Sequence, residues 1–121
     1  MALDLRKTLY WEGSSKKDFK GFPVPVQKEL GVALFVVQLG GFPPKAKPWK
    51  GLGSGVYELV HDNRGNAFRV VYTVRFRCAV HVLHAFQKKS ASGIATPRPD
   101  VTLIEGRLRA VTARYGPGRS E

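Results

Sequence analysis

Residues 67–90 read AFRVVYTVRFRCAVHVLHAFQKKS and predict a β-hairpin with a cationic tip. In its first strand apolar side chains alternate with a second set, which puts the two sets on opposite faces of a sheet. The apolar set is Phe68, Val70, Tyr72, Val74 and Phe76, and the second set is Arg69, Val71, Thr73 and Arg75. We expect one face to be buried and the other to present arginine, which suits phosphate or carboxylate groups.

Two turns set the register of three neighbouring strands. If Arg77-Cys78 is a two-residue loop, three pairs follow: Arg75 with Val80, Val71 with His84, and Arg69 with Phe86. If residues 63–66 form the turn before it, Glu58 lies opposite Val71. Both registers put the same residues on one open face, namely Glu58, Arg69, Arg75, His84 and Lys88. The other face, with Tyr57 and Leu59, is left for helices to bury.

The chain carries a large positive charge for its size. In its 121 residues, 20 Lys and Arg against 9 Asp and Glu give a formal net charge of +11. We expect an anionic partner, either a nucleic acid or an acidic protein. The alternative is that the charge serves solubility alone. A single cysteine, Cys78, excludes an internal disulfide and a cysteine-rich zinc site.

The length fits one domain over residues 1–121, with a flexible tail at residues 116–121. The first residues lack the apolar segment of a secretion signal. The longest uninterrupted apolar run, Val32–Val37, is too short to span a bilayer. We therefore expect a soluble, cytoplasmic protein that makes no membrane contact.

Two helices are expected between a strand at residues 7–11 and the next strand at residues 55–62. Ser15 should cap a short helix, with Asp18 three residues later completing the cap. Pro25 opens a longer helix, whose apolar stripe predicts that it covers a sheet. The stripe consists of Val26, Leu30, Ala33, Leu34 and Val37, and the helix ends at Gly40-Gly41.

A third helix is expected after the hairpin and a flexible link at residues 91–93. Thr96 should cap it, with Pro97 in the first turn. Its apolar stripe is Val101, Ile104, Leu108, Val111 and Tyr115. The whole order predicts an α+β fold, in which two N-terminal helices pack on a small antiparallel sheet and a C-terminal helix follows.

The segment 42–55 holds too much proline and glycine for regular structure and predicts a loop. Its lysines Lys45, Lys47 and Lys50 surround Trp49, a combination that suits a nucleic-acid contact. The alternative is that Trp49 anchors the loop on the core while the lysines are solvated.

The expected open face has the groups needed to cleave RNA without a metal ion. A base takes the proton of a 2′-hydroxyl, the oxygen attacks phosphorus, and cations stabilise the charge that develops. Glu58 or His84 is the candidate base, and Arg69 and Lys88 are the candidate cations. The alternative is structural: an ordinary cross-strand salt bridge between Glu58 and Arg69, with His84 as a hydrogen-bonded residue of the sheet.

The remaining histidines do not predict a metal site. His81 and His84 are expected on opposite faces of one strand, and no carboxylate cluster accompanies them. We expect His81 to be a bonded core residue on the face of Leu83, and His61, at a strand end, to be solvated. Neither a metal nor another cofactor is expected.

Four segments together resemble the phage-derived, HigB-like branch of the RelE/ParE toxin superfamily. They are WKGLGSGVYEL at residues 49–59, FRVVY at 68–72, VLHAFQKKS at 82–90 and Thr96-Pro97. The resemblance implies that Arg69 contacts the scissile phosphate and that Lys88 lies near a second catalytic cation. Arg75 and Lys89 join the loop lysines as candidate RNA-binding residues. No clear catalytic tyrosine follows Lys89, because Tyr115 belongs to an apolar stripe.

The resemblance also implies a function and a set of partners. The protein would be the toxin of a type II toxin–antitoxin system, an endoribonuclease that cleaves mRNA on the ribosome. A helix-turn-helix, HigA-like antitoxin would block it, and operator DNA would be bound only through that antitoxin. Two alternatives stay open: a ParE-like inhibitor of DNA gyrase without nuclease activity, and a basic RNA-binding module.

Overall fold

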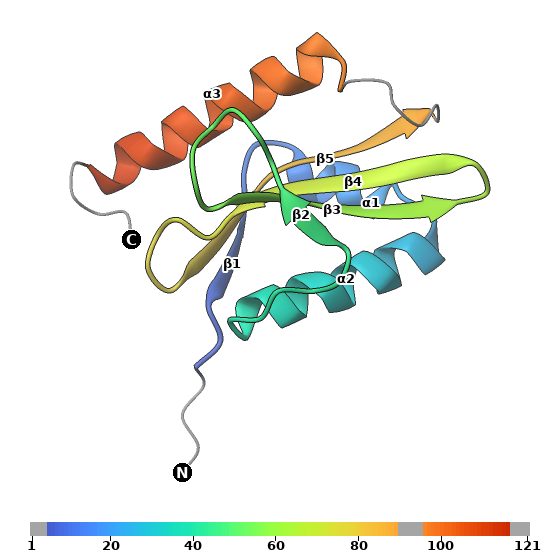
Figure 1. The fold of residues 1–121 in the computed structure, drawn as a ribbon, viewed down its shortest axis with the longest axis horizontal. Helices are drawn as coiled ribbons and strands as arrows, with labels where there is room; N and C mark the ends of the chain where they lie inside the picture. Colours follow the sequence, from blue (N-terminus) through green and yellow to red (C-terminus); the bar gives the residue numbers. More distant parts are fainter. Residues whose placement is uncertain (1–4, 90–95, 117–121) are drawn as a thin grey trace.

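The computed structural model describes residues 5–89 and 96–116. In chain order its elements are β1 (Thr8–Trp11), α1 (Ser15–Lys20), α2 (Val24–Gln38), β2 (Ala46–Pro48), β3 (Val56–Asn63), β4 (Asn66–Thr73), β5 (Ala79–Lys89) and α3 (Arg98–Tyr115) (Figure 1). The link predicted at residues 91–93, and all but the first residue of the predicted tail, lie outside the described residues.

The strands form one five-stranded sheet in the order β1-β5-β4-β3-β2. β1 runs parallel to β5, whereas the other neighbouring strands are antiparallel. The α+β class is therefore confirmed, but the sheet is mixed and not purely antiparallel as predicted. β1 and β5 are distant in the chain, so no hairpin forces them into opposite directions.

The predicted registers are confirmed in the centre of the sheet. Glu58 pairs with Val71 across β3 and β4, and Val71 pairs with His84 across β4 and β5. The predicted pair of Arg69 with Phe86 is also found. Next to Val71 the β4–β5 register shifts, because the following pair skips Leu83. Leu83 is thus the extra residue of a β-bulge, a feature that the alternation of the sequence did not reveal.

The hairpin tip differs from the predicted two-residue loop. β4 ends at Thr73 and β5 begins at Ala79, so Arg75 lies in the loop and does not pair with Val80. Two-residue turns need residues that readily adopt positive φ, and Arg77-Cys78 lacks the glycine that usually supplies them. The chain forms a longer loop instead, in which Cys78 has a φ of 60°.

One face of the sheet is buried by apolar side chains of α1 and α2. The stripe predicted for α2 is confirmed, because all five of its residues are buried. Phe19 of α1 joins this core, and α1 contacts β5 while α2 contacts β3 and β5. The sheet residues in this core include those predicted for the helix-covered face: Leu59, Phe68, Val70 and Tyr72, with Tyr57 packed against them.

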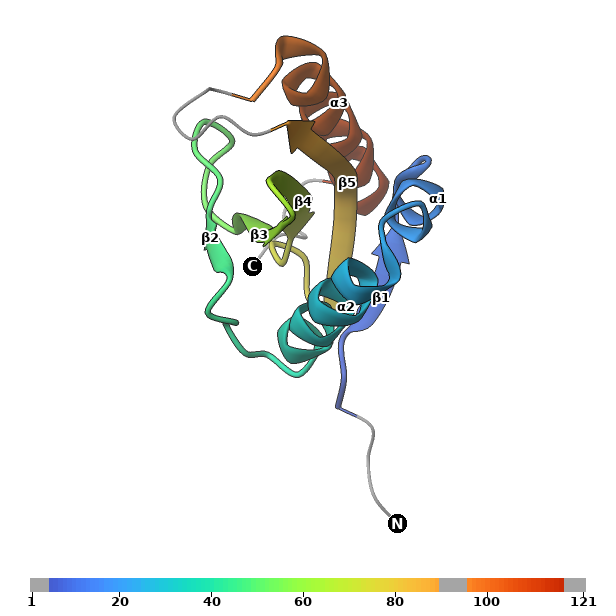
Figure 2. The same cartoon turned by 90° about the vertical axis from the view of Figure 1, so that its right-hand side faces the viewer.

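The other face of the sheet is covered by α3, so the prediction of an open face is wrong. Figure 2 shows the sheet between α2 and α3. Ile104, Leu108 and Val111 of α3 pack on this face in a second core. The sheet residues of that core are Val56, Val71, Leu83 and Phe86, and Phe76 joins them from the hairpin loop instead of lying with Phe68 as predicted.

The predicted helix caps are each displaced by one residue. Ser14, not Ser15, occupies the N-cap of α1, and its hydroxyl donates to the Asp18 carboxylate at 2.7 Å. Ser15 is buried, and its hydroxyl donates to the carbonyl of Val82. Pro97, not Thr96, occupies the N-cap of α3.

A short strand lies within the segment that was predicted to be a loop. β2 pairs with β3 at the edge of the sheet, where Pro48 lies opposite Tyr57. Proline is tolerated there because an edge strand does not need every backbone N–H for the ladder. Trp49 packs against the α3 core, which confirms the interpretation of this residue as a loop anchor.

We predict that Gly13→Ala lowers the free energy of unfolding by about 2 kcal/mol, whereas Gly40→Ala lowers it by about 1 kcal/mol. Both glycines have positive φ, but only a Cβ at Gly13 would meet another group, the guanidinium of Arg107 at 2.6 Å. Arg107 would have to leave the carbonyl of Leu83, to which it donates at 2.9 Å. Urea unfolding of both variants measures the difference, and equal losses would contradict this role of Arg107.

Candidate functional site

Four charged side chains from four neighbouring strands meet on the α3 face of the sheet. Glu58 of β3 lies at their centre and is buried. Arg69 of β4 donates from Nη1 to Glu58 Oε1 at 2.9 Å, and Nζ of Lys47 in β2 lies 3.4 Å from the same oxygen. Lys88 of β5 lies close enough to Arg69, Glu58 and Lys47 for their charges to change its pKa. We call these four residues the cation cluster.

The cation cluster holds three basic groups for one carboxylate. Lys88 is only 8% exposed, and its pKa is lowered by burial and by the nearby charges of Arg69 and Lys47, against the opposing effect of Glu58. Nε of Arg69 is buried and has no hydrogen-bond partner within the described residues. A buried excess of positive charge with an unused donor favours the binding of an anion.

His84 lies on the same face and is held by α3. Its Nε2 is 2.7 Å from Oδ1 of Asp100, in the first turn of α3, and its ring stacks on Phe86. A carboxylate accepts a hydrogen bond, so in the neutral imidazole Nε2 carries the proton and Nδ1 is an acceptor. Nδ1 is buried and has no partner in the part of the chain that the structure describes. This arrangement is that of a base oriented by a carboxylate.

The predicted site residues are thus only partly brought together. Glu58, Arg69, His84 and Lys88 share one face, as predicted, but that face is largely buried. Arg75 is elsewhere, because its guanidinium donates to the carbonyls of Leu52 and Ser54 and holds that loop. The Glu58–Arg69 contact is also the one expected of a purely structural salt bridge, so it does not by itself indicate catalysis.

The loop lysines have separate surroundings. Lys47 belongs to the cation cluster, whereas Lys45 contacts Nδ1 of His61 at 3.0 Å. This contact, with His61 half-buried, corrects the prediction that His61 is solvated. Lys50 is exposed, and the side chain of Lys89 lies outside the described residues.

Asp100 and the surroundings of His81 were missed in the sequence. One feature of the sequence could have indicated Asp100. It is an acidic residue in the first turn of a helix whose apolar stripe has to pack on the sheet. His81 is buried and bonded through both ring nitrogens, as predicted for a core histidine. The bulge at Leu83, however, puts His81 on the α3 side with His84, and not on the opposite face.

The described residues hold no group of three or more His, Cys, Asp and Glu side chains that could bind a metal ion. None of the helices found in them is both long and apolar enough to cross a membrane.

The family model described as phage-derived protein Gp49-like (DUF891) matches residues 17–109, which include the cation cluster and most of α3. No curated protein matches the chain, and no solved structure matches it either.

We predict that Lys88→Met raises the free energy of unfolding at neutral pH. The lowered pKa of Lys88 means that the folded protein disfavours its charge, and methionine keeps the length of the side chain without that charge. Between the lowered pKa and the ordinary value of 10.5, the unfolded chain binds more protons than the folded one. The stability of the parent should therefore rise with pH through this range, and that rise should be absent in Lys88→Met.

Urea unfolding over the alkaline range measures both effects, with the exposed Lys50→Met as the control that changes neither. A Lys88→Met protein that is less stable than the parent at neutral pH would show that the ammonium group stabilises the fold.

Proposed function

The chain belongs to the phage-derived Gp49-like family, and we propose that it is the toxin of a type II toxin–antitoxin system that cleaves mRNA on the ribosome. The observation that carries the proposal is the cation cluster, in which three basic groups surround one carboxylate on a buried face. A phosphodiester that develops extra negative charge is the kind of group that such a cluster stabilises.

The fold is compatible with a RelE/ParE-like, HigB-type toxin, to which the sequence bears its resemblance. The chain has the expected order of a strand, two helices, the sheet hairpins and a C-terminal helix. Arg69 and Lys88, the two cations that the resemblance singles out, lie on adjacent strands of one face. The order of elements supports the assignment to the toxin superfamily, and the two cations are what RNA cleavage needs.

The proposed reaction needs no metal ion. His84 is the proposed base: its Nδ1, buried in this structure, must become accessible to take the proton of the 2′-hydroxyl, and the freed oxygen then attacks the adjacent phosphorus. The bond to the 5′-oxygen breaks, that oxygen takes up a proton, and a 2′,3′-cyclic phosphate remains. Arg69 and Lys88 stabilise the charge on the phosphoryl oxygens, and Asp100 orients the imidazole.

Lys47 indicates the side from which the substrate approaches. Its side chain is 58% exposed while its ammonium group lies near Glu58. Lys47 is therefore the member of the cation cluster that an RNA phosphate arriving from solvent contacts first. The exposed Lys50 lies close by in the sequence, and we propose that both bind the RNA backbone beside the cleaved bond.

The proposal implies a set of partners. A helix-turn-helix, HigA-like antitoxin would neutralise the toxin, and the pair would contact operator DNA through the antitoxin. The mRNA and the ribosome both carry negatively charged phosphates, which are complementary to the formal net charge of +11 of the chain. The protein would act in the cytoplasm, where these partners occur.

We predict that Lys88→Met abolishes toxicity while the protein stays folded. Losing one charge that stabilises the transition state should slow mRNA cleavage by about 100-fold or more. Growth and pulse labelling of protein synthesis after induction without antitoxin measure the effect. The exposed Lys28→Met on α2, which removes the same charge on the opposite face of the sheet, should stay toxic.

The same experiment separates the alternatives. Arrest of DNA synthesis before protein synthesis in the parent would indicate gyrase inhibition and contradict the proposal. A folded Lys88→Met protein that cleaves mRNA at the parental rate would remove the cation cluster from the reaction.

We predict that His84→Gln slows mRNA cleavage on programmed ribosomes by at least about 100-fold, because glutamine cannot act as a base. Asp100→Asn should reduce the rate less, since it only orients the ring. A His84→Gln protein with near-parental activity would leave His84 as a residue of the sheet, and the same comparison for Glu58→Gln would then test the other candidate base.

A further inference from the structure

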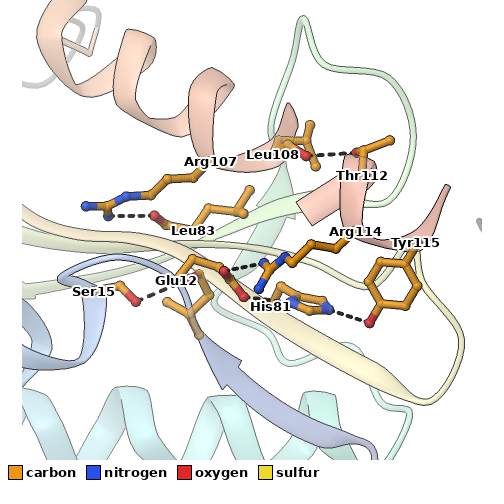
Figure 3. A network of polar contacts seen from close by, with 10 residues as sticks. Glu12, Ser15, His81, Leu83, Arg107, Leu108, Thr112, Arg114 and Tyr115 are labelled. Carbon is orange, nitrogen blue, oxygen red and sulfur yellow. Dashed lines mark hydrogen bonds and ion pairs between the residues drawn. The ribbon is translucent and has the colours of Figure 1, made fainter. Parts of the chain in front are cut away.

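A second polar network lies at the other end of β5, where α3 ends. Figure 3 shows Glu12, which follows β1, together with His81 of β5 and Arg114 and Tyr115 of α3. Nδ1 of His81 is 2.8 Å from Oε2 of Glu12, and its Nε2 is 2.7 Å from the hydroxyl of Tyr115. Arg114 donates to the other carboxylate oxygen of Glu12.

For a neutral His81 ring, the hydrogen bonds of the network have one consistent set of directions. Burial raises the pKa of Glu12, but hydrogen bonds from His81 and Arg114 outweigh it and hold that pKa below its ordinary value. The ionised carboxylate accepts from Nδ1–H, so Nε2 of the neutral ring accepts the hydrogen of the Tyr115 hydroxyl. Burial raises the pKa of Tyr115, which keeps its phenol protonated. The phenol oxygen therefore faces its remaining surroundings as an acceptor.

A cavity of about 210 Å³ opens beside this network and is lined by Tyr10, His81, Arg114 and Tyr115. The ring of Tyr10 stacks on His81, with centroids 4.8 Å apart, and yet Tyr10 is 46% exposed. The side chain of Arg114 is 58% exposed. We call these four residues the tyrosine pocket. It presents an exposed aromatic ring, a guanidinium and an oriented phenol to one space.

The size and chemistry of the tyrosine pocket limit what it binds. Sites for whole small molecules commonly have volumes of about 300–1,000 Å³, so this cavity fits one unit of a longer chain better. An aromatic ring next to a cation is the combination that holds single-stranded nucleic acid, because the base stacks and the phosphate pairs. The formal net charge of +11 favours the same polyanion.

We propose that the tyrosine pocket is a second RNA contact, which binds one nucleotide of the strand at a distance from the cleaved bond. The base stacks on Tyr10, the phosphate pairs with Arg114, and Tyr115 accepts a hydrogen bond. The Glu12–His81 pair positions the phenol and touches no RNA, since both ring nitrogens are already bonded. The identification of the ligand as RNA rests on the proposed function, whereas the existence and the lining of the pocket do not.

The position of the tyrosine pocket relative to the cation cluster suits an extended single strand of RNA. His81 and Lys88 lie on the same α3-covered side of β5. Their partners on β4, Thr73 and Ala67, are six residues apart, which corresponds to about 20 Å along a strand. The pocket and the cation cluster are thus separate sites that one single strand of a few nucleotides can reach together.

The test measures binding without cleavage. A short fluorescein-labelled oligouridylate with 2′-O-methyl groups has no 2′-hydroxyl to react, and its anisotropy reports affinity at fixed ionic strength. Tyr10→Leu should weaken binding about tenfold, whereas Tyr10→Phe, which keeps the ring, should bind like the parent. Arg114→Gln should weaken binding about fivefold and reduce the salt dependence by about one phosphate contact.

Arg109→Gln is the matched control, because Arg109 is exposed on the same helix, carries the same charge and lies outside the pocket. It should change the affinity by less than about twofold. Equal losses in Arg109→Gln and Arg114→Gln would reduce the effect to general charge and overturn the proposal. Thermal unfolding shows whether each variant is folded.

A second measurement does not depend on the variants. In NMR titrations of the parent, the ring resonances of Tyr10 and Tyr115 should shift as the oligouridylate is added, and unchanged resonances at saturation would overturn the proposal. Loss of mRNA cleavage with these shifts retained would instead count against the nuclease function alone.

Discussion

The enclosure of β5 is the constraint on which the rest of the structure depends. The strand pairs with β1 on one edge and β4 on the other, and it has a hydrophobic core on each face. Polar side chains in such a strand must find bonding partners, because unpaired polar groups are costly to bury. His81 and His84 meet this requirement with residues of α3, and Lys88 lies beside Arg69 and Glu58. The two histidines of β5 are therefore tied to the position of one helix.

The helix α3 is held to β5 by polar contacts as well as by its apolar stripe. Asp100 binds His84 near its start, and Tyr115 binds His81 at its end. Between them Arg107 donates to the carbonyl of Leu83, the bulge residue whose backbone has left the regular ladder. The bulge thus gives the sheet a point of attachment for the helix. Covering this face also lowers the local dielectric, which strengthens the electrostatic effect of the cation cluster.

The sequence correctly predicted those features of the fold that follow from the periodicity of apolar residues. The stripe of α2 and the pairing of Glu58 with Val71 and of Val71 with His84 follow from alternation and turn length, and the structure has all of them. The bulge could not be predicted, because Val82 and Leu83 are both apolar and each can be buried on either face of the sheet. The prediction that this face of the sheet is open to solvent was wrong for a different reason. Charged residues that alternate with apolar ones are typical of a solvated face, and only the stripe of α3 indicated that a helix had to be buried somewhere.

The two histidines of β5 show how tertiary contacts assign different chemistry to the same side chain. Each ring is oriented by a carboxylate from another element, but Glu12 binds Nδ1 of His81 whereas Asp100 binds Nε2 of His84. The remaining nitrogen of His81 is used by Tyr115, so that ring transmits orientation and has no acceptor left. The remaining nitrogen of His84 has no partner among the described residues. Of the two, only His84 therefore keeps a ring nitrogen without a partner among the described residues, whereas both ring nitrogens of His81 hold neighbouring side chains in place.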